Sequence, residues 1–167
     1  MSELDTLLKA KDDFAFLGLP PQFPLDSVTL DAAVTRIANQ ISSASSDQAA
    51  QLRQRVAAAK QRLADPVQRA RYLLALLSGI EGPGPGELPE SVKSFEGQVA
   101  SATDPTSLSA LKSAMFSERQ ARLDHVATVF SFPRDLPNRV AQTSRDSAMW
   151  SDLRVIDAID QLLAKLA

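Results

Sequence analysis

The sequence predicts an all-α protein, and three observations support that class. Apolar residues recur three and four positions apart over long stretches, which places them on one face of a helix. Aromatic residues make up only 5% of the chain, and no useful length alternates between apolar and polar residues as a strand would. Prolines interrupt the periodic stretches at positions where helices are expected to end.

The first half predicts a short helix followed by three longer ones. Residues 3–10 can form the short helix, and residues 12–25 are interpreted as a hydrophobic plug leading into an extended, proline-rich connector. Further helices are expected at about 26–41, 49–64 and 66–79, the last ending at a glycine. The apolar stripes of the first two of these are Leu30, Val34, Ile37 and Ile41, and Leu52, Val56, Ala59 and Leu63.

The glycine- and proline-rich stretch 79–90 predicts a break between two domains, because no regular element tolerates this composition. We therefore expect a first domain at 1–80, a linker at 81–89 and a second domain at 90–167. The second domain should be a three-helix bundle whose helices cover about 90–101, 105–130 and 138–166.

Composition excludes several classes of function. The net charge is −2, so nucleic-acid binding is not expected, since phosphate contacts need an excess of cations. Cysteine is absent, which excludes thiolate catalysis and cysteine metal sites within the chain. No stretch approaches the ~20 apolar residues of a membrane span. The N-terminus resembles neither a signal nor a transit peptide, so we expect a bacterial cytoplasmic or mitochondrial matrix protein that is not secreted.

Few residues suggest catalysis. His125 is the only histidine and sits within a predicted helix, where such a residue is usually structural. Asp157 and Asp160 share a helical face and could form a general acid–base pair, but the spacing is more typical of a solvated face. We expect no enzyme activity, no metal site and no cofactor.

Cations gather on the second half of the first domain. Arg55, Arg62 and Arg69 form a candidate basic face, which is either solvated or meets an acidic protein partner.

Two segments resemble a known family. Residues 57–79 resemble the end of a J-domain, with Leu63, Asp65-Pro66, Arg69 and Tyr72 matching its Leu-x-Asp-Pro-x-x-Arg-x-x-Tyr pattern. Residues 12–26, "DDFAFLGLPPQFPLD", resemble the opening of HscB-type (Jac-type) co-chaperones of iron–sulfur cluster assembly. The resemblance implies an L-shaped protein in which a J-domain-like helical hairpin is joined to a C-terminal three-helix bundle.

The loop that acts in that family has a different sequence here. The family carries His-Pro-Asp between the two hairpin helices, and this motif triggers ATP hydrolysis by a DnaK/HscA-type chaperone. In this chain the corresponding residues are Ser42, Ser43, Ala44, Ser45, Ser46 and Asp47. The resemblance thus implies a degenerate J-domain, and stimulation of a chaperone ATPase is not expected.

The family has a second surface, on the first and last helices of the bundle, which holds the iron–sulfur scaffold protein. The resemblance implies candidate partner-binding residues at Val92, Phe95, Glu96, Val99, Arg154 and Val155. The expected function is a non-enzymatic, HscB-like binding protein linked to iron–sulfur cluster biogenesis. The alternative is a helical adaptor or structural subunit of a larger complex.

Overall fold

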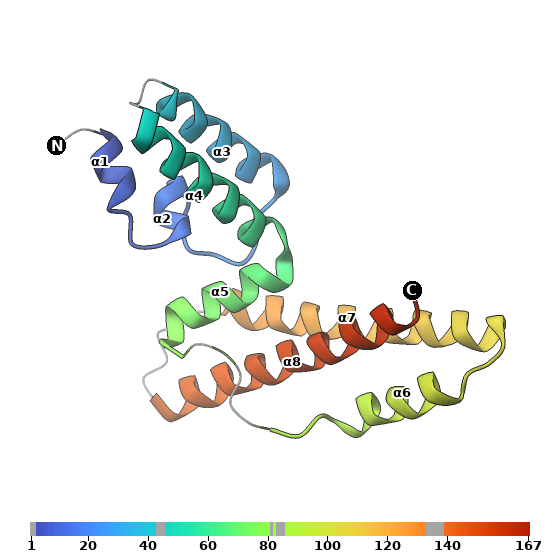
Figure 1. Cartoon of the computed structure of the whole chain (residues 1–167). Helices are drawn as coiled ribbons and strands as arrows, with labels where there is room; N and C mark the ends of the chain where they lie inside the picture. The colour runs from blue at the N-terminus through green and yellow to red at the C-terminus, as the bar shows by residue number, and fades with distance from the viewer. Residues whose placement is uncertain (1–2, 43–45, 81, 83–85, 133–138) are drawn as a thin grey trace. The chain divides into compact units, whose positions relative to one another are not determined.

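The computed structural model describes residues 3–42, 46–80, 82, 86–132 and 139–167. Within these residues the chain forms helices joined by short segments and contains no strand, which confirms the all-α class (Figure 1). In chain order the helices are α1 (Glu3–Leu8), α2 (Asp13–Leu17), α3 (Ser27–Ile41), α4 (Ser46–Ala64), α5 (Pro66–Ser78), α6 (Glu90–Ser101), α7 (Pro105–Ser131) and α8 (Arg139–Lys165).

The chain divides into two compact units, Met1–Leu73 and Leu74–Ala167, and the division falls inside α5. Residues 81 and 83–85 of the expected linker lie outside the described part of the chain. The domain boundaries expected from the glycines and prolines therefore stay a prediction.

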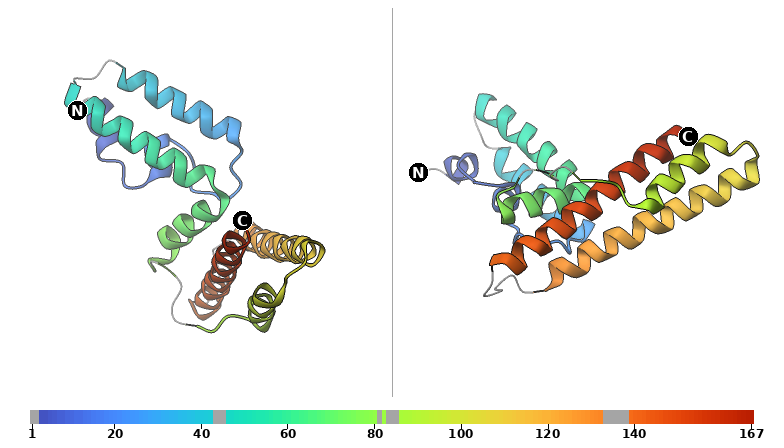
Figure 2. Two further views of the ribbon diagram at one scale, coloured as in Figure 1. Left: turned by 45° about the vertical axis from the view of Figure 1, so that its right-hand side comes forward. Right: turned by 90° about the horizontal axis from the view of Figure 1, so that it is seen from below.

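The first unit is built on the hairpin of α3 and α4, which lie side by side (Figures 1 and 2). Asp26 caps α3 by accepting the backbone N–H of Thr29, as expected for an aspartate just ahead of a helix. The expected stripes face each other in the core, except that Val34 is only partly buried. Their buried members are Leu30, Ile37, Ile41, Leu52, Val56, Ala59 and Leu63.

The hydrophobic plug expected in residues 12–25 is buried, and it contains a short helix that the sequence did not indicate. Residues Asp13–Leu17 form α2, which begins at the cap Asp12 and ends at Gly18, whose φ of 64° suits a glycine. Phe14, Phe16 and Leu17 are fully buried on it. The helix is too short to show a periodic stripe, so only its two caps could have indicated it.

The second unit is the expected bundle of α6, α7 and α8, with α7 and α8 adjacent along their length (Figure 2). Asp104 caps α7, and Pro105 occupies its first turn. One core cluster joins the three helices and consists of Val92, Leu111, Met115, Val155, Ile159 and Leu162. Within the described residues, no helix is both long and apolar enough to cross a membrane.

Candidate functional site

The connection between α3 and α4 is the first candidate site. Ser42 ends α3 with helical backbone angles, and its hydroxyl donates to the carbonyl of Asn39 at 2.6 Å. Ser46 begins α4, three residues earlier than expected, and Asp47 lies in its first turn. Ser43, Ala44 and Ser45 lie outside the described residues. The described ends of this connection thus serve as helix termini.

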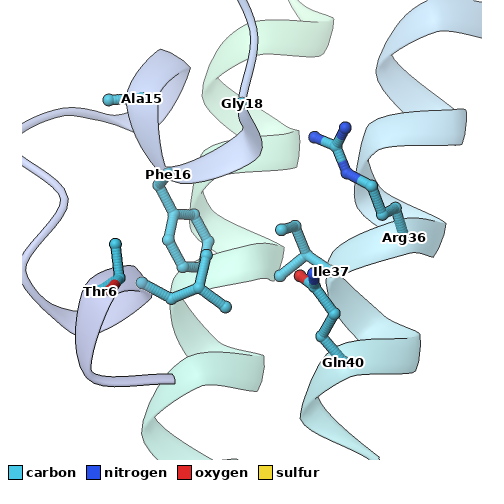
Figure 3. Close-up of a pocket in the computed structure, with 8 residues that line it drawn as sticks. Thr6, Ala15, Phe16, Gly18, Arg36, Ile37 and Gln40 are labelled. Atoms are coloured by element: carbon cyan, nitrogen blue, oxygen red, sulfur yellow. The ribbon is translucent and has the colours of Figure 1, made fainter. Parts of the chain in front are cut away.

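On α3, Arg36 is used to hold α2 in place. Its guanidinium donates to the carbonyl of Leu17, beside the turn at Gly18, and Figure 3 shows it reaching toward that turn. A cavity of about 390 Å³ lies next to this contact, between α1, α2 and α3, and is lined in part by Phe16 and Ile37. The one arginine of α3 therefore stabilises the first unit rather than presenting an unengaged positive charge.

Arg55 on α4 binds the N-terminal segment. It donates to the carbonyls of Leu7 and Leu8 at 3.1 Å each and to the carbonyl of Ala10 at 2.6 Å. Its guanidinium also lies 4.5 Å from the centre of the Phe16 ring. These contacts bind α1 and α2 to the hairpin.

Arg62 and Arg69 have similar internal roles. Arg62 pairs with the carboxylate of Asp13 and lies 4.9 Å from the centre of the Tyr72 ring. Arg69 is buried and donates to the carbonyl of Phe23 at 2.9 Å and to that of Leu63, and its burial lowers its pKa. We therefore interpret Arg55, Arg62 and Arg69 as clamps that hold the first unit together, with Arg69 buried and Arg62 still exposed to solvent. Sequence reasoning did not identify these contacts.

Tyr72 on α5 completes the attachment of α2. Its hydroxyl accepts the backbone N–H of Asp13 at 2.7 Å, and its ring stacks on Phe14 with the ring centres 6.0 Å apart. Burial is the main cause that raises the pKa of this hydroxyl above its ordinary value.

Replacing Tyr72 with phenylalanine is expected to lower the free energy of unfolding by about 1 kcal/mol near neutral pH, because the Asp13 N–H loses its acceptor. The folded state holds the Tyr72 proton more tightly than the unfolded state does. Burial of the neutral hydroxyl therefore stabilises the wild-type protein in full below the ordinary pKa of about 10, and this stabilisation is lost as pH rises through the folded pKa. Chemical unfolding of both proteins should show their difference narrowing above about pH 10. A constant difference across that range would contradict the assignment.

The residues predicted for partner binding on the bundle fall into two groups. Val92 and Val155 are 0% and 1% exposed in the core cluster, so their side chains cannot contact a partner and we remove them from the candidate surface. Phe95 and Val99 are partly buried against the same cluster, and Glu96 is exposed. Each valine lies on the apolar stripe of its helix, which explains why both are packed in the core.

Arg154, predicted on the same surface, is partly buried on α8. Its guanidinium lies against Gly86, where a Cβ atom would collide with it. A glycine at position 86 thus lets the backbone approach this arginine closely.

A polar network that the sequence did not reveal joins α7 to α8. The buried carboxylate of Asp152 contacts Nδ1 of His125 at 2.6 Å and accepts from Arg122 at 3.1 Å. Arg122 also donates to Glu118, and this contact is the main cause that raises the pKa of Arg122. The network satisfies a buried charge, so we interpret His125 as structural.

Asp160, one of the two aspartates predicted to share a face of α8, has a partner on α7. Asp160 accepts from Arg119 of α7 at 2.6 Å, which favours a structural ion pair over a general acid–base role. Among the described residues, no three histidine, aspartate or glutamate side chains are grouped so that they could hold a metal ion.

The fold of this chain is similar to that of solved structures, of which two are described here. The crystal structure of the human co-chaperone protein HscB matches 95% of this chain and 81% of its own, with a TM-score of 0.70 and 17% identity. This chain has the HscB fold. The chaperone HscB from Vibrio cholerae matches 93% of this chain and 94% of its own, with a TM-score of 0.64 and 23% identity. The HscB fold confirms the resemblance indicated by residues 12–26 and 57–79.

Comparison of the sequence alone identifies no relative: no protein-family model matches it, and no curated protein is significantly similar. The chain thus has the HscB fold at 17% and 23% identity to these two structures. The internal clamps formed by Arg69 and Tyr72 belong to the segment that carries the J-domain pattern, so this pattern has a structural role in the chain.

Proposed function

We propose that the chain is a non-enzymatic, HscB-like binding protein linked to iron–sulfur cluster biogenesis, and that it does not stimulate a chaperone ATPase. One observation carries this proposal. The HscB fold extends over 95% of the chain, while the sequence between α3 and α4 contains neither histidine nor proline. This combination supports a protein that has the fold used for partner binding but lacks the residues that would act on a chaperone.

Two features of the first unit support the loss of chaperone activation. Serine side chains cannot replace a proline-fixed turn that presents an imidazole and a carboxylate. In addition, Arg36, Arg55, Arg62 and Arg69 are all held by contacts within the unit. A chaperone surface that draws on these four arginines would compete with the contacts that hold the unit together.

The partner surface that we propose lies on α6. Glu96 is exposed, and Phe95 and Val99 are partly exposed beside it. A charged residue next to apolar side chains is the composition expected where a polar rim meets a hydrophobic patch. We assign this surface to an iron–sulfur scaffold protein, as in the family that the sequence resembles.

The direct test is calorimetric titration of the full chain with the iron–sulfur scaffold protein of the same organism. We expect saturable binding that weakens roughly tenfold in Glu96→Lys, because a reversed charge opposes the partner's complementary one. The matched control Glu90→Lys reverses a charge on a different face of α6 and should bind as the wild type does. Absence of binding by the wild-type chain would refute the proposed function.

A second candidate function is supported by exposed apolar side chains in the second unit. Leu76, Ile80, Phe116 and Phe132 are 42%, 50%, 55% and 54% exposed. Such residues suit a helical adaptor or structural subunit that is covered inside a larger complex. This alternative predicts that the tagged chain co-purifies from its host with one large complex at a fixed ratio and without the scaffold protein.

A further inference from the structure

The short helix α1 is held at its C-terminal end by a residue of α4. The last carbonyls of a helix lack partners within it, and α1 has no basic residue in its last turn to offset them. Arg55 supplies this cation by donating to the carbonyls of Leu7 and Leu8 and to that of Ala10, just beyond the helix. These contacts are to backbone carbonyls, so they recognise a helix C-terminus rather than one particular side chain.

Apolar side chains surround this contact. The centre of the Phe16 ring lies 4.5 Å from the Arg55 guanidinium, and Phe16 is fully buried. Leu7, Phe16 and Ile37 line one cavity of about 390 Å³. Figure 3 shows the Phe16 ring between Thr6 on α1 and Ile37 on α3. The surface beneath α1 therefore combines an arginine with apolar and aromatic side chains, which is the composition of the central part of many protein interfaces.

Helix α1 occupies this surface incompletely. Six residues form fewer than two turns and make a marginal helix by themselves, so α1 depends on its contacts with the rest of the unit. Thr6 is exposed, and Leu7 and Leu8 are only partly buried. The cavity beside α1 lies within the roughly 300–1,000 Å³ of ligand pockets, so a bulkier segment has room there. A short segment with few buried apolar contacts opens locally, and another helix can then take its place.

We propose that Arg55, Phe16 and Ile37 form a docking site for the C-terminal end of a partner's helix, and that α1 covers this site in the free chain. The partner's helix carries leucines and ends in free carbonyls, because that is the chemistry of the segment now seated there. Apolar side chains that reach into the cavity bury more surface than α1 does and favour the exchange. The proposal goes beyond the proposed function and does not depend on it, since that function uses α6.

The first test measures binding of a fluorescein-labelled peptide with the sequence of residues 1–11 to the full chain by fluorescence anisotropy. In the wild type α1 competes for the site, whereas Leu8→Asp weakens α1 and leaves the site intact. We expect the Leu8→Asp chain to bind the peptide at least about tenfold more tightly, because its internal competitor is removed. Equal or weaker binding by Leu8→Asp would overturn the role of α1 as a cover. Absence of binding by both chains would overturn the docking site.

A second pair of variants tests the contacts of Arg55. Arg55→Gln in the Leu8→Asp chain should weaken peptide binding by at least about tenfold, since it removes the charged donors to the helix end. Arg53→Gln in the same chain neutralises an exposed arginine two residues away on α4, and this variant should bind as Leu8→Asp alone does. Unchanged binding after Arg55→Gln would overturn the proposal.

Trypsin provides a measurement that needs no peptide and no change in α1. Lys9 and Lys11 are exposed between α1 and α2, and cleavage after them requires α1 to open. Arg55→Gln in the otherwise wild-type chain should speed this cleavage by at least about tenfold, whereas Arg53→Gln should leave it unchanged. Circular dichroism verifies that each variant is folded. An unchanged cleavage rate in Arg55→Gln would overturn the proposal even if Leu8→Asp did not fold.

Discussion

Replacing Arg69 with methionine is expected to lower the free energy of unfolding of the first unit by about 3 kcal/mol. Methionine fills much of the same space, so the main loss is that of the charged donors. The carbonyls of Phe23 and Leu63 would then be left without the guanidinium that they now contact in the interior. The contact of Arg69 with the Phe23 ring, 5.2 Å from its centre, would also be lost.

This change is measured by denaturant unfolding followed by circular dichroism. Arg53→Met is the matched control, because Arg53 is an exposed arginine on α4 and should change stability by less than about 0.5 kcal/mol. Equal effects of the two substitutions would show that Arg69 is not the clamp described here.

Replacing Met115 with alanine is expected to lower the free energy of unfolding of the bundle by about 3 kcal/mol. Met115 is fully buried where α6, α7 and α8 meet, and its truncation leaves a cavity in the core cluster. Trp150 fluorescence follows the unfolding of this unit alone, since the first unit contains no tryptophan.

The neighbouring residue provides the control for Met115. Phe116→Ala removes a larger side chain that is 55% exposed, so it should cost less than about 1 kcal/mol. A larger loss in Phe116→Ala than in Met115→Ala would contradict the register of α7. It would favour a bundle whose core is built from the other face of that helix.

The fold class was predictable because the spacing of apolar residues along a long helix shows which of its faces packs into the core. The stripe of Leu52, Val56, Ala59 and Leu63 faces the core as its period requires. The bounds of α6 and α7 agree with the sequence to within a residue, since Asp104-Pro105 signals a helix start. The five-residue helix α2 could not be predicted in this way, because it contains less than two turns.

The site residues were harder to predict, because a side chain's partner is set by tertiary packing. The spacing of Arg55 and Arg62 places both on one face of α4. It does not show that the carbonyl of Ala10 lies against Arg55 or that the carboxylate of Asp13 lies against Arg62. Likewise, the resemblance placed Val155 on the partner-binding surface, but its side chain is buried in the core. Periodicity locates faces of helices, whereas the contacts of a long polar side chain depend on which segment crosses that face.

The absence of the ATPase trigger can be tested most directly by measuring ATP hydrolysis by the DnaK/HscA-type chaperone of the same organism. The chaperone is assayed alone, with this chain, and with a J-domain protein that carries an intact His-Pro-Asp motif as a positive control. We predict that this chain leaves the hydrolysis rate unchanged at concentrations where the control raises it. A several-fold increase caused by this chain would contradict the account, since Ser42 to Asp47 would then have to act as a trigger.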